Sequence, residues 1–178
     1  SGSFEVSGTL TNSGTIMGST TSCSDCNIET GAISESNAIV DGNTQGMDAL
    51  MDCYYRYNYS QQIYLQSEVG SSCTITKVYF EWDGYTSTSE NWVIYLGNTS
   101  KSAFSSSSDW ISTSNMTQVF SGSVSYPSSA GWVEITLDTE FTYDDNYNLV
   151  VAVDENTYGY PGSSADFYSA SVSTYRNL

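Results

Sequence analysis

The segment Thr74–Trp82 (TITKVYFEW) decides the fold class, because apolar and polar side chains alternate along it. Successive side chains of a β-strand point to opposite faces, so Val78 and Phe80 share one face while Tyr79 lies on the other. The same period of two returns in three later segments, at 92–96 (WVIYL), 133–137 (VEITL) and 149–153 (LVVAV). Each segment carries an apolar face that has to be buried.

Turn-forming residues separate these segments, for example Asp83-Gly84 and Gly97-Asn98, and no long helical period interrupts them. A second sheet is then the simplest cover for the apolar faces. The sequence therefore predicts an all-β fold, an antiparallel β-sandwich or jelly roll.

The chain of 178 residues is long enough for one domain with a substantial core. Residues 1–46 are rich in Ser, Thr and Gly and carry only a thin apolar alternation at Phe4, Val6 and Leu10. We interpret them as an N-terminal segment that is an edge strand, a linker, or a strand donated to a neighbouring subunit. Residues 47–178 are predicted to form the β-sandwich domain.

The charge balance excludes some partners. Lys and Arg number 4 against 20 Asp and Glu, which gives a formal net charge of -16. Such a surface repels phosphate backbones and anionic membranes, so nucleic acid is not an expected partner. No apolar run is long enough to cross a bilayer, so membrane insertion is not expected either.

The chain contains no histidine, which removes Ser-His-Asp and Cys-His nucleophile pairs and any histidine general base. Its cysteines do not have the paired spacing of a structural zinc site. Disulfides are the expected state, with three possible pairings, and they indicate an extracellular or cell-surface protein. The four cysteines are Cys23, Cys26, Cys53 and Cys73.

Aromatic side chains suggest a ligand. The 15 Tyr and 4 Trp occur among abundant Asn, Asp and Ser, the combination that stacks on sugar rings and bonds their hydroxyls. Trp132 is opposite in phase to Val133, so its ring is expected to face outward, and Tyr158 and Tyr160 lie in a loop that could form a pocket rim. Trp82 and Trp92 share phase with core positions and are interpreted as packing residues.

Calcium is a candidate ion, because oxygen ligands gather on two loops. Asp144, Asp145 and Asn146 lie between two predicted strands, and Asp154 ends the next strand. Neither loop has the EF-hand spacing, and Asp and Asn also form turns through their own backbone hydrogen bonds. Two carboxylates could serve a glycosidase, but no pair is distinguished by its context, so no catalytic residue and no enzymatic activity are predicted.

A set of motifs downstream of Tyr57 keeps its order and spacing. The motifs are 94–99 (IYLGNT), Phe104, 109–111 (DWI), 119–122 (VFSG), 131–137 (GWVEITL) and 148–154 (NLVVAVD). Together they resemble a β-sandwich module that recurs in secreted and cell-surface proteins of Bacteroidota, often beside fibronectin-type domains, peptidases or carbohydrate-active enzymes. The resemblance covers roughly Tyr57–Leu178 and implies a non-catalytic extracellular module. It does not extend to Ser1–Asp52.

Two functions follow as hypotheses. The first is a disulfide-bonded extracellular binding or adhesion module whose ligand is a glycan or a surface protein. The alternative is a structural subunit of an extracellular filament or surface layer, in which the N-terminal segment is donated as a strand to another copy of the chain.

Overall fold

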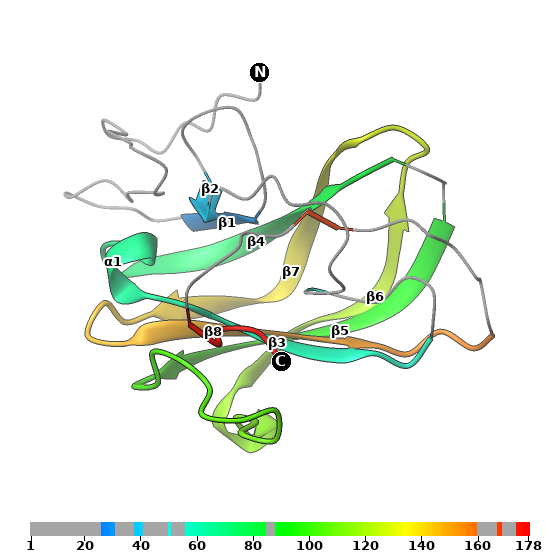
Figure 1. Cartoon of the computed structure of the whole chain (residues 1–178). Coiled ribbons are helices and arrows are strands. Elements are labelled where there is room, and N and C mark those ends of the chain that lie inside the picture. Colours follow the sequence, from blue (N-terminus) through cyan, green and yellow to red (C-terminus); the bar gives the residue numbers. More distant parts are fainter. Residues whose placement is uncertain are drawn as a thin grey trace.

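The computed structural model of the protein describes residues 26–30, 38–40, 50, 56–84, 88–159, 167–168 and 174–178. Within them the chain forms two sheets that pack face to face (Figure 1). The first sheet consists of β1 (Cys26–Thr30), β2 (Ala38–Val40), β4 (Cys73–Trp82) and β7 (Gly131–Tyr143), in the order β2-β1-β4-β7. The second consists of β3 (Tyr59–Tyr64), β5 (Thr88–Thr99), β6 (Thr117–Tyr126) and β8 (Asn148–Glu155), in the order β3-β8-β5-β6.

The two sheets confirm the predicted all-β sandwich. The chain crosses between the sheets after β2, β3, β4, β6 and β7, so most neighbouring strands are not consecutive in sequence, as in jelly rolls. The pairings among β3 to β8 are antiparallel. β1 departs from this pattern, because it runs parallel to both β2 and β4.

Part of the N-terminal segment belongs to the sandwich, since β1 and β2 pair inside the same chain. Phe4, Val6 and Leu10, and with them the donated strand, lie outside the described residues. Cys73 is buried at the start of β4 and Cys26 begins β1, whereas Cys23 and Cys53 also lie outside the described residues. Among the residues that the structure describes no disulfide is seen, and the pairing stays a prediction.

The described helical segments are the single turn α1 (Gln66–Val69) and the 3-10 turn η1 (Thr113–Asn115). In this part of the chain no helix is long and apolar enough to cross a membrane.

An aromatic cluster fills the core between the sheets. Trp82 and Trp92 are buried, which confirms the interpretation of both as packing residues. The ring of Phe167 lies 5.0 Å from Trp82 and 5.6 Å from Trp92, and Tyr126 lies 4.7 Å from Trp82. Trp82 donates its indole N–H to the carbonyl of Pro127 at 2.8 Å, so its polar atom is satisfied despite the burial.

The connection between β5 and β6, residues 100–116, folds over the outer face of the second sheet and is drawn in green below it in Figure 1. β8 is consequently covered on both faces, and Val150 and Ala152 on its outer side are fully buried. The fit is close at Gly97, where a Cβ atom would lie 3.1 Å from both Met116 Cγ and Val150 Cγ1. A side chain at this position would require these neighbouring side chains to shift.

Phe167 contacts both buried tryptophans although it lies far from them in sequence, so Phe167→Ala is expected to lower the free energy of unfolding by about 3–5 kcal/mol. Urea denaturation followed by tryptophan fluorescence measures this loss. The control is Tyr158→Ala, whose ring is exposed and should change stability by less than about 0.5 kcal/mol. Equal losses in the two variants would show that Phe167 is not part of the core.

Candidate functional site

Of the three residues predicted to bind a ligand, the two that the structure describes belong to different sheets. Trp132 lies half-buried on the outer face of the first sheet, paired with Glu81. Tyr158 lies in the loop after β8 of the second sheet and is highly exposed. Tyr160 lies outside the described residues. The alternation correctly placed the Trp132 ring away from the core, but it could not show which surfaces share a side of the molecule.

Trp132 shares its face of β7 with a charged group. The carboxylate of Glu134, two residues along the strand, accepts from Lys77 Nζ at 2.7 Å and from the Tyr79 hydroxyl at 2.8 Å. These hydrogen bonds, that of Lys77 first, hold the pKa of Glu134 below its usual value. The pair is solvent-exposed and contributes little stability.

A different aromatic group lies on the outer face of the second sheet. The rings of Tyr59 on β3 and Trp110 in the β5–β6 connection are 5.3 Å apart and tilted by 46°. Tyr59 pairs with Asp154 on β8, and Tyr95 on β5 pairs with Ala152, two residues from Asp154. We call Tyr59, Tyr95, Trp110 and Asp154 the aromatic platform.

The electrostatics of Tyr59 reflect these neighbours. Burial raises the pKa of the Tyr59 phenol above its usual value, and the Asp154 carboxylate and the Tyr95 phenol raise it further. The hydroxyl therefore stays protonated at physiological pH and can take part in neutral hydrogen bonds.

Gln61 holds the platform together from beneath. Its side chain is fully buried, its Nε2 donates to the Ile111 carbonyl at 2.6 Å, and its Oε1 accepts from the Ile111 amide at 2.8 Å. The same Nε2 donates to the Tyr59 hydroxyl at 2.8 Å. One amide thus fixes both the backbone next to Trp110 and the ring of Tyr59. A ligand that contacts these rings does not have to order them, which lowers the entropic cost of binding.

A second set of contacts fixes the connection just before Trp110. Asp109 pairs with Lys101, and its Oδ2 accepts from the backbone and the hydroxyl of Ser105, both at 2.9 Å. The hydrogen bond from Lys101, followed by those from Ser105, lowers the pKa of Asp109 to about 2. Phe104 is buried beneath, and its amide donates to the Tyr175 carbonyl at 2.6 Å.

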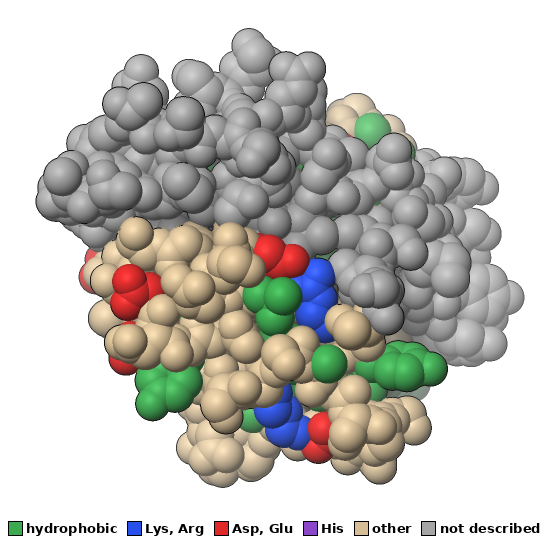
Figure 2. All heavy atoms as spheres, turned by 60° about the vertical axis from the view of Figure 1, so that its left-hand side comes forward, with side chains coloured by type: hydrophobic (Ala, Val, Ile, Leu, Met, Phe, Trp, Pro, Cys, Tyr) green, Lys and Arg blue, Asp and Glu red, His purple; other side chains and the backbone are tan. Residues whose placement is uncertain are grey.

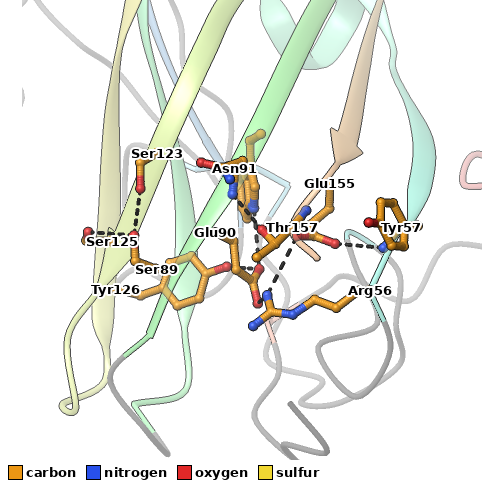
Figure 3. A network of polar contacts seen from close by, with 11 residues as sticks. Arg56, Tyr57, Ser89, Glu90, Asn91, Ser123, Ser125, Tyr126, Glu155 and Thr157 are labelled. Atoms are coloured by element: carbon orange, nitrogen blue, oxygen red, sulfur yellow. Dashed lines mark hydrogen bonds and ion pairs between the residues drawn. The ribbon is translucent and has the colours of Figure 1, made fainter. Parts of the chain in front are cut away.

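Hydroxyl groups continue the outer face beyond the platform. Ser89 on β5 lies opposite Ser125 on β6, and its hydroxyl is 2.6 Å from that of Ser123 and 3.3 Å from that of Ser125 (Figure 3). All three side chains are exposed. The face therefore joins aromatic rings to a row of neutral hydrogen-bonding groups.

Two carboxylates point into the sandwich at one end. Glu90 has the phase of Trp92, and Glu155 has the phase of Val153, so both side chains are buried, at 2% and 1% exposure. Arg56 lies between them: it pairs with Glu90, and its Nη1 is 3.6 Å from Glu155 Oε1 (Figure 3). Buried charges need such partners, because desolvation of an isolated ion is costly.

Glu90 also satisfies polar atoms of the aromatic core. It accepts from the Tyr126 hydroxyl and, at 3.4 Å, from the indole N–H of Trp92. Burial raises the pKa of Glu90, an effect that exceeds the lowering by Tyr126 and Arg56. Because both buried carboxylates are engaged by groups of the protein itself, this cluster, which we call the buried ion network, has the character of a structural element.

The residues predicted to bind calcium are split between the two ends of β8. Asp144, Asp145 and Asn146 form the turn before the strand, and Asp154 lies near its end. Asp144 accepts from the Asn146 amide at 3.0 Å and side chain at 2.6 Å, and these bonds lower its pKa. In the part of the chain that the structure describes, no group of three or more Cys, Asp or Glu side chains is close enough to hold a metal ion. Calcium binding at either loop stays a prediction.

No family model, curated protein or solved structure matches this chain. The resemblance to the Bacteroidota module therefore stays a prediction.

The raised pKa of Glu90 makes stability depend on pH. The folded protein binds the proton of the Glu90 carboxyl more tightly than the unfolded chain does. Protonated Glu90 therefore adds to the free energy of unfolding in full below the ordinary glutamate pKa of about 4.3, and this stabilisation is lost as the pH rises through the raised pKa. Glu90→Gln should remove that decline in the free energy of unfolding. Urea titrations at a series of pH values test this, with the exposed Glu140→Gln as control. An unchanged pH slope in Glu90→Gln would contradict it.

Lys101→Met should raise the pKa of Asp109 from about 2 toward the ordinary aspartate value of about 3.9. In the wild type, Asp109 binds its proton less tightly than in the unfolded chain. The ionised carboxylate therefore stabilises the fold above the ordinary aspartate pKa, and this stabilisation is lost as the pH falls toward about 2. Carboxyl ¹³C NMR titration measures both values. Lys77→Met, which removes the partner of Glu134, should leave Asp109 unchanged. An unaltered Asp109 pKa in Lys101→Met would show that Lys101 does not hold the loop.

Proposed function

We propose that the chain is a non-catalytic, extracellular binding module that holds a neutral glycan on the outer face of the β3-β8-β5-β6 sheet. The observation that carries the proposal is the preorganised pair of Tyr59 and Trp110, fixed by the buried amide of Gln61. The ring of Trp110 is 42% exposed although its backbone is pinned on both sides.

Sugar recognition needs such a combination of groups. The apolar faces of a pyranose stack on aromatic rings, and its hydroxyls bond to neighbouring polar groups. Asp154 supplies an acceptor beside Tyr59, and Asn91, Ser121 and Gln118 continue the same outer face along β5 and β6. The rings contribute contact area, and the polar groups contribute orientation.

The ion pairs argue for a neutral ligand. The sequence has four Lys and Arg residues, and each of them pairs with a carboxylate of the chain: Arg56 with Glu90, Lys77 with Glu134, Lys101 with Asp109 and Arg176 with Glu68. In Figure 2 each basic group on the visible face lies beside an acidic one. An anionic polysaccharide would meet a net charge of -16 without a basic side chain to receive it.

Two considerations support a non-catalytic role. The chain has no histidine, and among the described residues the two buried carboxylates, Glu90 and Glu155, are already bonded to protein groups. The extracellular location rests on the cysteine content and the resemblance to secreted modules. The alternative of a filament subunit depends on residues 1–11, outside the described part of the chain.

Trp110→Ala should lower the affinity for the best-bound neutral oligosaccharide by about tenfold or more, because it removes the exposed stacking ring. A panel of cello-, xylo-, manno- and galacto-oligosaccharides identifies that ligand, with heparin and polygalacturonate as polyanions that should not bind. Isothermal titration calorimetry then measures the change.

The matched control is Tyr147→Ala, because Tyr147 is exposed to a similar degree but lies on the turn between β7 and β8. Its affinity should equal that of the wild type. Preferential binding of the polyanions would contradict the proposal, as would undiminished binding by a folded Trp110→Ala protein. If no glycan in the panel binds, the proposal of a glycan-binding module is overturned.

A further inference from the structure

Two exposed tyrosines lie at the end of the second sheet where β3 begins and β8 ends. Tyr57 is 61% exposed and Tyr158 is 90% exposed. Aromatic rings are normally at least partly buried, because removing their apolar surface from water is favourable. Neither ring contributes to the hydrophobic core.

One buried carboxylate holds the backbone of both tyrosine segments. Glu155 Oε2 accepts from the Tyr57 amide at 2.8 Å, and Oε1 accepts from the Thr157 amide at 2.7 Å, next to Tyr158. Figure 3 shows the Glu155 carboxylate between Tyr57 and Thr157. The two segments are thereby kept within the span of a single side chain, although they are far apart in sequence.

The backbone at Tyr57 is strained. Its φ of 63° lies in the left-handed region, and no other non-glycine residue in the described part of the chain has a positive φ. A bulky aromatic residue in this region is uncommon and persists only where the surroundings enforce it. The hydrogen bond from its amide to Glu155 is such a constraint.

Glu155 is itself held by several contacts. It is buried, its amide donates to the Asn58 carbonyl at 2.8 Å, and Arg56 lies beside its carboxylate. The next residue, Asn156, donates its amide to Asn91 at 2.8 Å, and the Asn91 amide donates to the Thr157 hydroxyl at 2.7 Å. Several hydrogen bonds therefore fix the backbone next to both exposed tyrosines.

We propose that Tyr57 and Tyr158 form a second sugar-stacking subsite, positioned by Glu155, that extends the aromatic platform toward the end of the sheet. Tyr57 precedes the platform residue Tyr59 by two positions, and Asp154 of the platform precedes Glu155 directly. A neutral glycan chain bound at Trp110 and long enough to extend past Tyr59 and Asp154 is the ligand that both subsites would contact. This inference rests on the proposed function and specifies that the ligand is an extended chain.

Chain length tests the inference. Calorimetry is performed with one neutral oligosaccharide series, from disaccharide to hexasaccharide, chosen as the series that the wild type binds best. Wild-type affinity should rise with length. Tyr57→Ala and Tyr158→Ala should each lower hexasaccharide affinity about tenfold and leave disaccharide affinity unchanged. Tyr175→Ala, which removes a ring that is 77% exposed elsewhere, should change neither.

Glu155→Gln tests the positioning role. The variant keeps the size of the side chain but loses one acceptor oxygen, so only one of the two amides keeps its partner. Hexasaccharide affinity should fall while disaccharide affinity is retained. Because the change also removes a charge beside Arg56, a lower Tm is expected as well. An equal loss of affinity for the disaccharide and the hexasaccharide in the folded variant would overturn the assignment of Glu155 as a positioning residue.

The outcomes separate the two proposals. If Trp110→Ala weakens binding but the Tyr57 and Tyr158 variants bind hexasaccharide as the wild type does, the second subsite is overturned and the binding module stands. If the wild type binds no member of any neutral series, both are overturned.

Discussion

This end of the sandwich depends on the ion pairs that Arg56 forms with the buried carboxylates of Glu90 and Glu155. Both acids project inward from central strands of the second sheet, where an isolated charge would cost several kcal/mol. The guanidinium offsets that cost, and it ties the segment before β3 to β5 and β8. Glu90 then satisfies Tyr126 and Trp92 in the aromatic core. Removal of one member would leave the others buried without full compensation.

The same network links the core to the surface. Glu90 faces the aromatic cluster, while Glu155 faces the two segments that carry Tyr57 and Tyr158. Gln61 plays a similar part for the platform, since a single buried amide fixes Tyr59 and the backbone beside Trp110. In both places a buried polar side chain fixes exposed rings, and such rings can bind without a large ordering cost.

The sequence predicted the sandwich because its strands alternate over several residues, as β4 does from Val78 to Trp82. β6 was not predicted: its sequence TQVFSGSVSY has few apolar residues, and its pairing with β5 shifts register between Ile94 and Tyr95. The phases of Trp82, Trp92 and Trp132 were correct, since they depend only on local alternation. The platform could not be predicted, because it requires the long-range pairing of Tyr59 with Asp154 and the folding of residues 100–116 over the sheet. The local sequence hinted at the platform through Gln61, a polar residue at an outward position of β3.

The central claim is that a neutral glycan binds at Trp110. The most direct test follows the indole ¹H–¹⁵N signals of the four tryptophans while a neutral oligosaccharide from the panel is added. We expect the Trp110 signal to shift and the signals of the buried Trp82 and Trp92 to stay in place. A shift of Trp132 in place of Trp110, or a Trp110 signal unmoved by every member of the panel, would contradict it.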